Sequence, residues 1–164
     1  MPYIAAGSGG KVLDEYHRNK STLIQAFVLF ILTARVVVKY ADSYFHNRAR
    51  LSLVKFIVLQ ALLLNKEGLS LTDLARYTST ERHNITTLID RMRKEDLVTT
   101  KRGVADRRLV NVRLTEKGTE AVTRAFELSR DVINRVMQDT DEADLATFQK
   151  QLSVMNKNAS DALT

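Results

Sequence analysis

Four basic residues and one acid lie close together near the middle of the chain, and their side chains suit the binding of a polyanion. Lys101, Arg102, Arg107 and Arg108 fall within one short segment, and Asp106 directly precedes the last two. Guanidinium groups bind phosphate through paired hydrogen bonds, and arginine is attracted into the electronegative minor groove of A·T-rich DNA. Asp106 can pair with the guanidinium of Arg108 and orient it. These residues predict a contact with DNA.

The residues that flank this segment predict a β-hairpin that holds it away from the body of the protein. Residues 110–114 alternate between apolar and polar, as in a strand with one buried face. Val98 begins a matching strand on the other side of the basic segment. Lys101, Arg102 and residues 106–108 then occupy the projecting end of the hairpin.

A helix-turn-helix is predicted immediately before the hairpin. Ser70 with Asp73, and Thr78 with Glu81, both have the spacing of a residue that caps the N-terminus of a helix. They predict one short helix ending near residue 77 and a second over residues 82–95. Two short capped helices separated by a few residues are typical of this motif.

The second of these helices has an apolar side and a side of hydrogen-bonding residues. In a helix-turn-helix the second helix enters the major groove of DNA, where Asn, Arg and Thr are the usual partners of adenine, guanine and thymine edges. The residues expected to face inward are Ile85, Leu88, Ile89 and Met92. Those expected to read bases are Arg82, His83, Asn84, Thr86 and Thr87.

Long helices are predicted on both sides of this central region. Residues 13–50 contain no Gly or Pro and are apolar on nearly every side, and residues 52–65 predict a second apolar helix. After the hairpin, Thr115 is expected to cap a long amphipathic helix, and Asp141 with Asp144 to cap the last one. The inner sides expected for these two helices are Val122, Phe126, Ile133, Val136 and Met137 for the first, and Leu145, Phe148, Leu152 and Met155 for the last.

The first helix needs more cover than a chain of this size provides. A helix that is apolar all round must be buried on several sides, so we expect a second copy of the chain to cover it. Residues 23–38 are apolar enough to suggest a membrane span. The segment contains Gln25, Thr33 and Arg35, however, and is shorter than the roughly 20 apolar residues that a span requires. Residues 1–6 do not have the pattern of a signal peptide. We therefore expect no membrane association and a cytoplasmic protein.

Composition agrees with a DNA-binding protein. The chain has 164 residues, of which 45% are hydrophobic, a net charge of +6 and no cysteine. The charge favours a polyanionic partner, and the lack of cysteine excludes disulfides and thiolate metal sites. Three of the six glycines and the only proline fall within residues 1–10, which predicts a loose N-terminal tail.

At this point the chain resembles a known family, the MarR-type (multiple antibiotic resistance regulator) transcriptional regulators. The segments "SLTDLARY" and "ITTLIDRMRKEDLV" are similar to the scaffold and recognition helices of that family. The resemblance covers about residues 20–160, and its specific motifs lie within residues 70–118. The wing signature that it shares consists of Asp106, Arg108, Val112, Leu114, Thr115 and Gly118.

The resemblance implies a mainly α, winged helix-turn-helix fold and an obligate homodimer that represses transcription from a pseudo-palindromic operator. Arg108 would enter the minor groove, Asp106 would orient it, and residues 82–87 would read bases. Many members release DNA when a small aromatic or anionic effector binds. The implied divisions are a tail over 1–12, dimerisation helices over 13–51 and 119–164, and the DNA-binding domain over 52–118.

Two positions depart from the family pattern. Asp96 stands where the family usually has Gly, just after the recognition helix. Asp tolerates a positive φ better than most residues, so the turn remains possible. Thr99 stands where an arginine is more usual, which could move the phosphate contacts of the wing.

An enzyme or metal site finds little support in the sequence. His17, His46 and His83 are scattered; Asp42 and His46 lie four residues apart, and Asp14 and His17 three apart, without a third ligand nearby. We expect no catalytic residues, no metal and no cofactor. Two other functions remain open: a winged helix that binds another protein, and a basic protein that coats DNA without sequence preference.

Four aromatic residues form a candidate ligand pocket. Tyr40, Tyr44, Phe45 and Phe56 could line a site for an aromatic effector. The same spacing is typical of core packing, and the sequence does not separate the two interpretations.

Overall fold

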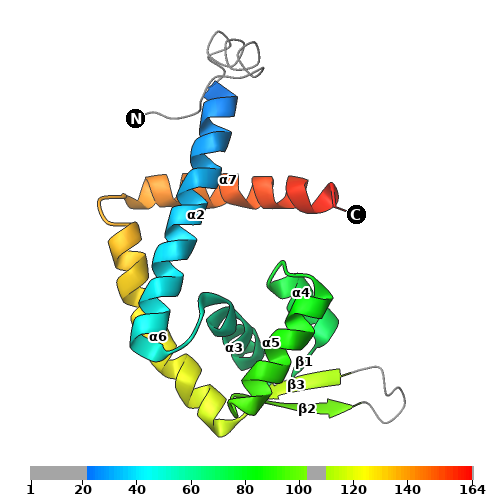
Figure 1. Ribbon diagram of the computed structural model, residues 1–164. Coiled ribbons are helices and arrows are strands. Elements are labelled where there is room, and N and C mark those ends of the chain that lie inside the picture. Colours follow the sequence, from blue (N-terminus) through cyan, green and yellow to red (C-terminus); the bar gives the residue numbers. More distant parts are fainter. Residues whose placement is uncertain (1–21, 103–109, 164) are drawn as a thin grey trace, which may run out of the picture.

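The computed structural model describes residues 22–102 and 110–163, which form a winged helix-turn-helix flanked by long helices (Figure 1). The mainly α fold predicted from the sequence is confirmed. The elements are α2 (Thr22–Ala49), α3 (Leu53–Leu64), β1 (Leu69–Ser70), α4 (Leu71–Tyr77), α5 (Arg82–Lys94), β2 (Val98–Arg102), β3 (Val110–Leu114), α6 (Glu116–Val136) and α7 (Glu142–Asp161).

The sheet is antiparallel, with the strand order β1-β3-β2. Val98 pairs with Leu114 at one end of the predicted hairpin, and Leu69 of β1 pairs with Val112 on the other edge of β3. The two-residue strand β1 was not predicted, because so short a segment carries no alternation. Gly68 precedes it with φ 87°, and a β-carbon there would collide with the backbone of Val112, so this turn requires glycine.

The core is built around α3. Val58 and Leu59 are fully buried between the winged helix and the long helices. Phe56 stacks on Phe45 of α2, with ring centroids 4.7 Å apart, and meets Phe126 of α6 edge-on at 5.5 Å. These rings join three helices in one apolar layer. The predicted inner side of α5 is confirmed, since Ile85, Ile89 and Met92 are buried and Leu88 is half-buried.

Most of the predicted helix caps are present. The hydroxyl of Ser70 accepts a hydrogen bond from Asp73 N at 3.1 Å, and that of Thr115 accepts one from Gly118 N at 2.9 Å. Asp141 caps α7 in the same way through Asp144 N at 2.7 Å. Each bond satisfies a backbone donor that has no partner within its own helix.

The cap predicted for the recognition helix was wrong. Thr78 ends α4, because its backbone N–H and its hydroxyl both donate to the carbonyl oxygen of Leu74, at 3.0 and 2.8 Å. It is therefore held in the preceding helix and cannot cap the next one. Glu81 occupies the N-cap position of α5, without a hydrogen bond from its side chain.

The inner sides predicted for α6 and α7 need correction. In α6, Val122 is buried as predicted and Phe126, Val136 and Met137 are half-buried. Ile133 is instead 56% exposed, and its neighbour Val132 is buried in its place. No described residue of α7 is buried: Phe148 is 49% exposed, and Leu145, Leu152 and Met155 are half-buried. In Figure 1, α7 turns away from the end of α6. It makes few contacts with the other described helices, so its apolar residues stay at least partly exposed.

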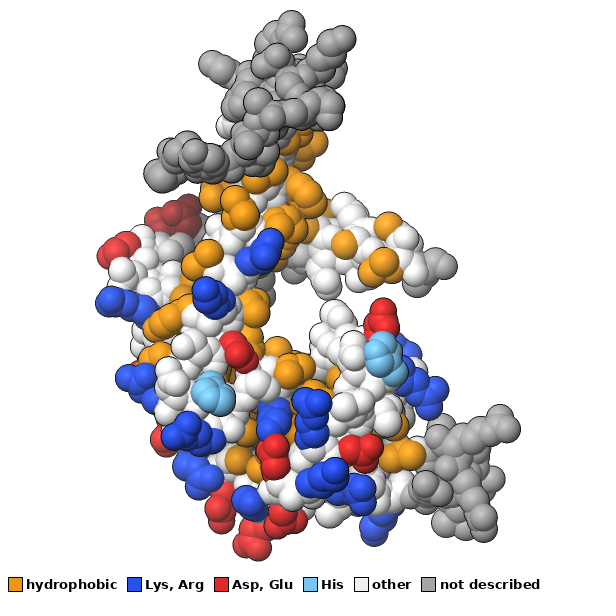
Figure 2. Space-filling model, in the orientation of Figure 1, with side chains coloured by type: hydrophobic (Ala, Val, Ile, Leu, Met, Phe, Trp, Pro, Cys, Tyr) orange, Lys and Arg blue, Asp and Glu red, His pale blue; other side chains and the backbone are white. Residues whose placement is uncertain are grey.

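Helix α2 leaves most of its apolar surface uncovered. Within its described residues only Ala41 and Phe45 are buried, while Leu23 is 78% exposed and Val36 67%. Figure 2 shows the hydrophobic side chains gathered along this helix. By length and composition alone α2 could cross a membrane, and none of its most apolar window is buried within the chain. An exposed apolar surface of this extent is typical of a site of interaction with another surface.

Candidate nucleic-acid interface

The outer face of α5 presents the residues predicted to read DNA. All five, Arg82, His83, Asn84, Thr86 and Thr87, are exposed, and they fall in the N-terminal half of the helix. The buried residues of α5 hold its other side against the core. The N-terminus of the helix adds unpaired backbone N–H groups and a partial positive charge, both of which favour phosphate.

Two of these side chains are already oriented by the helix itself. The hydroxyl of Thr86 donates to the carbonyl oxygen of Arg82 at 2.9 Å, and that of Thr87 donates to the carbonyl oxygen of His83 at 3.2 Å. With the hydroxyl hydrogens engaged in this way, the oxygens are left as acceptors and the methyl groups as apolar contacts. Such a surface suits base amino groups and the thymine methyl group.

An acid lies at the beginning of the same face. A carboxylate oxygen of Glu81 is 3.2 Å from Nδ1 of His83, and both side chains are largely exposed. A negative charge at this place disfavours nonspecific contact with phosphate. It is compatible with accepting a hydrogen bond from a cytosine amino group.

The base of the wing lies beside the recognition helix. Strand β2 packs against α5, and in the ladder Lys101 pairs with Asn111 and Arg102 with Val110. The side chain of Lys101 is exposed. The predicted tip residues Asp106, Arg107 and Arg108, like the side chain of Arg102, fall outside the described residues. The described part of the hairpin thus includes a strand that contacts α5.

The end of α5 has the geometry that its departure from the family pattern suggested. Asp96 has φ 60°, in the left-handed region, and the N–H of Leu97 returns to the carbonyl oxygen of Met92 at 2.9 Å. The last turn of α5 carries Arg91, Arg93 and Lys94, which complement the negative end of the helix dipole. Lys and Arg side chains also spread over the part of the surface formed by the winged helix (Figure 2).

The Asp and His residues that the sequence offered as candidate metal ligands form no metal site within the described residues. The carboxylate of Asp42 accepts a hydrogen bond from Leu53 N at 2.8 Å and so caps α3, while His46 is exposed. Within residues 22–102 and 110–163, no group of three or more His, Asp or Glu residues could hold a metal ion. His17 and Asp14 fall outside the described residues.

The four aromatic residues of the candidate ligand pocket separate into two pairs. Phe45 and Phe56 are buried and stacked on each other in the core. Tyr40 and Tyr44 are half-buried, with ring centroids 5.9 Å apart, and the guanidinium of Arg48 lies 4.1 Å above the Tyr44 ring. The two tyrosines are thus the members of the set that a ligand could still reach.

Tyr44 also joins α2 to α6. Its hydroxyl donates a hydrogen bond to Oδ2 of Asp131 at 2.8 Å. This bond is the main reason why the pKa of Tyr44 is raised above its ordinary value, and partial burial adds to the effect while Arg48 opposes it. The phenol therefore remains a donor throughout the physiological range.

A known protein family matches the segment that holds this interface. Residues 51–109 match the model of the MarR family. The winged helix of this chain is thus similar to that of the MarR family. The matched segment includes the whole of α4 and α5.

Known proteins that are similar to this chain include transcriptional regulators. The repressor IacR of Pseudomonas putida is 28% identical over 97 residues, 58% of this chain and 58% of IacR. AbsC, a MarR family regulator from Streptomyces coelicolor, superposes with a TM-score of 0.79 at 20% identity, over 87% of this chain and 97% of AbsC. The chain thus spans somewhat over half the length of IacR and nearly all of AbsC.

Two further structures bear on the ligands of similar proteins. A MarR variant from E. coli in complex with operator DNA has a TM-score of 0.73 at 18% identity, over 81% of this chain and 94% of that one. BpsR of Bordetella bronchiseptica, whose DNA binding is regulated by 6-hydroxynicotinic acid, has a TM-score of 0.70 at 21% identity, over 78% and 90%. At these identities the structural likeness establishes the fold of the chain.

Proposed function

We propose that this protein is a cytoplasmic, sequence-specific DNA-binding repressor of transcription that acts as a homodimer on a pseudo-palindromic operator. Helix α5 enters the major groove and the wing arginine Arg108 the minor groove. The division of labour follows the expected boundaries: residues 52–118 bind DNA, and residues 13–51 and 119–164 form the dimer. A small aromatic or anionic effector releases the DNA.

The observation that carries the proposal is the exposed face of α5. Five hydrogen-bonding side chains lie together on the N-terminal half of a helix whose opposite side is buried, within a domain that matches the MarR family. A helix presented in this way can reach base edges without unfolding any part of the core. The uncharged members, Asn84, Thr86 and Thr87, favour base recognition over simple attraction to phosphate.

The proposal of a dimer is supported by apolar surface that one chain cannot bury. Phe27 and Leu29 of α2 are 56% and 66% exposed, on a helix that has only two buried residues in its described length. At the elbow between α6 and α7, a cavity of about 480 Å³ is lined in part by Met137, Leu145 and Phe148. A second copy that packs α2 and α7 of one subunit against those of the other covers both surfaces. It also gives the two recognition helices the symmetry of a palindrome.

The proposal of an effector is supported by Tyr40, Tyr44 and Arg48. Two accessible aromatic rings and a guanidinium lie close together on α2, on the side that faces α6. Rings of this kind stack on an aromatic compound, and the guanidinium pairs with an anionic group. BpsR, a protein of the same fold, has its DNA binding regulated by 6-hydroxynicotinic acid, which is an aromatic acid.

The two alternative functions make different predictions for DNA. A module that binds another protein has no need of exposed Asn84 and Thr86 beside a basic wing. A nonspecific coat would favour Lys and Arg on α5 over hydrogen-bonding groups without charge. Specific binding to one operator that resists competitor DNA would exclude both alternative functions.

The test is binding of the purified full-length protein to the DNA upstream of its own gene. Random duplex is the competitor, and the salt concentration is varied. We expect binding to one palindrome that survives the competitor, by a species with the mass of a dimer. Binding that random duplex abolishes would favour the nonspecific coat, and no binding at low salt would favour the protein-interaction module.

A further inference from the structure

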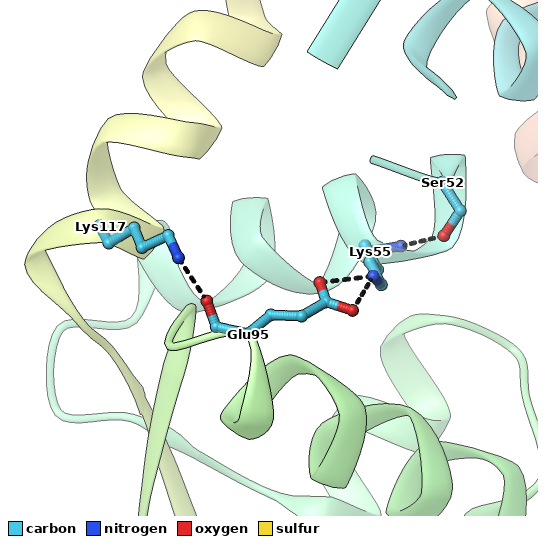
Figure 3. Close-up of polar contacts among 4 residues, drawn as sticks. All are labelled: Ser52, Lys55, Glu95 and Lys117. Carbon is cyan, nitrogen blue, oxygen red and sulfur yellow. Dashed lines mark hydrogen bonds and ion pairs between the residues drawn. The ribbon is translucent and has the colours of Figure 1, made fainter. Parts of the chain in front are cut away.

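The C-terminal end of the recognition helix is joined to two other helices through one residue, Glu95. Both carboxylate oxygens of Glu95 lie 2.6 Å from Nζ of Lys55, on α3. Its backbone carbonyl oxygen accepts a hydrogen bond from Nζ of Lys117 at 2.8 Å, in the first turn of α6. Figure 3 shows the three residues, here named the Glu95 junction, between α3, the end of α5 and the beginning of α6.

The ion pair of this junction is the least exposed of those that the structure describes, and it is the one among them that joins two separate helices, α3 and the end of α5. The Lys55 side chain is only 16% exposed, and it pairs with a residue 40 positions away. Arg93 with Asp90, and Arg76 with Asp73, join neighbours on one helix and are about half exposed or more. A partly shielded pair is less weakened by water and salt than an open one, and a pair between separate helices constrains their relative position.

The Lys55 side of the junction is itself held in place. The backbone N–H of Lys55 donates a hydrogen bond to the hydroxyl of Ser52 at 3.4 Å. The backbone N–H of Leu53, two residues earlier, donates to the carboxylate of Asp42 on α2 at 2.8 Å. The start of α3 is thereby fixed to the end of α2. Through the Glu95 junction, the end of α5 is connected to both α2 and α6, the long helices on either side of the DNA-binding region.

A small tilt at this end of α5 has a large effect at the other. With 13 residues at 1.5 Å each, α5 is about 20 Å long. A rotation of about 10° about its C-terminal end moves its N-terminus by roughly 3.4 Å, which is the spacing between successive base pairs. The residues proposed to read bases, among them Asn84, are at the end that moves.

We infer that Glu95 is a positioning residue: by holding α5 to α3 and α6 it determines the separation of the two recognition helices, and hence the half-site spacing that the dimer accepts. The inference rests on the proposed function, since it concerns a dimer on a palindrome. On this inference, a contact far from the DNA bases determines the spacing between half-sites that the dimer prefers. Glu95 itself does not need to touch DNA.

The separation of the two recognition helices can be measured without DNA. The chain has no cysteine, so Asn84→Cys provides a single site for a nitroxide label at the end of α5 that moves most. Pulsed electron spin resonance then gives the distance between the labels in the dimer. We compare the otherwise unchanged protein with Glu95→Gln, Lys55→Met and the charge exchange Lys55→Glu with Glu95→Lys.

We expect the single substitutions to shift or broaden the distance distribution by about 3 Å or more, and the charge exchange to restore it. Glu67→Gln is the matched control, because Glu67, in the turn before β1, pairs with Arg113 of β3 at 3.0 Å in the same domain and has no described hydrogen bond or ion pair with Glu95 or Lys55. A lower melting temperature with an unchanged distance would show a merely structural role and overturn the inference. If the exchanged pair fails to fold, Lys117→Met, which removes the other contact of the junction, is expected to broaden the distribution in the same way.

A second experiment measures the spacing preference on DNA. An operator is first selected from a pool of random duplexes with the unlabelled wild-type protein, and versions with one base pair added or removed between the half-sites are then prepared. We expect wild type to prefer the selected spacing by about tenfold and Glu95→Gln by threefold or less, with equal affinity for random duplex. Equal preference in both proteins would contradict the inference alone. A wild-type protein that selects no sequence, or that yields no distance between subunits, would contradict the proposed function and this inference with it.

Discussion

The hydroxyl of Thr115 donates a hydrogen bond to the carbonyl oxygen of Asp96 at 2.7 Å, and so fixes the residue just after the recognition helix to the cap of α6. The same hydroxyl accepts from the N–H of Gly118. Asp96 is the residue at φ 60°. The turn that follows α5 and the beginning of α6 are therefore parts of one hydrogen-bonded unit.

The left-handed conformation of Asp96 predicts an order of stability among substitutions. This conformation costs about 1–2 kcal/mol in residues with a β-carbon, less in Asp, and little in Gly. We expect Asp96→Val to lower the free energy of unfolding by about 1–2 kcal/mol and Asp96→Gly not to lower it. Urea denaturation of the three proteins measures the difference. Equal stability of the Val variant and wild type would show that the turn relaxes out of the left-handed region.

The Tyr44–Asp131 bond predicts a contribution to stability that disappears at alkaline pH. The bond raises the pKa of Tyr44, so the folded state favours the protonated phenol. The stabilisation is fully present below the ordinary pKa of about 10 and is lost as the pH rises through the higher value of the folded state.

We therefore expect wild type to unfold at a higher urea concentration than Tyr44→Phe between pH 7 and pH 9, and the two curves to converge above about pH 10. Tyr40→Phe is the control, because it removes a hydroxyl from the neighbouring ring and leaves the bond to Asp131 intact. If the difference in stability between wild type and Tyr44→Phe does not change with pH, the bond to Asp131 does not shift the pKa of Tyr44.

Local patterns in the sequence predicted the parts of the fold that depend on local physics. The caps at Ser70, Thr115 and Asp141 and the alternation in β3 each follow from residues within four positions of one another. The positive φ at Asp96 was indicated instead by the resemblance to the MarR family. The wrong cap at Thr78 has a cause outside the capping pattern itself. The capping pattern at Thr78 is the same locally, but the end of α4 already holds that residue.

Contacts between distant segments could not be predicted in this way. Lys55 and Glu95 are 40 positions apart, and Tyr44 and Asp131 are 87 apart, and nothing in the sequence around any of them indicates a partner. The exposed face of α5 could be predicted, because it depends only on which residues within one helix are polar and which are apolar. The contacts that orient α5 could not be predicted, because they come from distant residues on α3 and α6.

The exposed apolar surface of α2 predicts that the dimer depends on this helix. Phe27 is 56% exposed and distant from the buried residues Ala41 and Phe45. We expect Phe27→Lys to convert the dimer to a monomer at micromolar concentration, because a charge in an apolar interface is left without a partner. Sedimentation velocity gives the mass, and Gln25→Lys is the control for a charge added on the same helix at a residue that is already polar. A dimer that persists in Phe27→Lys would place the interface elsewhere.

The exposed amide of Asn84 predicts a role in the choice of bases. It lies on the outer face of α5, near the N-terminus, where an Asn can form two hydrogen bonds with an adenine. We expect Asn84→Ala to cost about 1–3 kcal/mol on the operator and much less on random duplex. Titration on both DNAs measures this difference. An equal loss on the two would make Asn84 a phosphate contact.

The wing predicts a second, separable contribution to binding. If Arg108 enters the minor groove, Arg108→Ala costs about 1–3 kcal/mol of operator affinity and leaves the mass of the dimer unchanged. Because a minor-groove arginine responds to the width and potential of the groove, the loss should be larger on an A·T-rich flank than on a G·C-rich one. Arg108→Lys keeps the charge and serves as the control, and we expect it to bind between wild type and Arg108→Ala. An affinity that none of these changes alters would remove the wing from the mechanism and leave α5 as the principal contact.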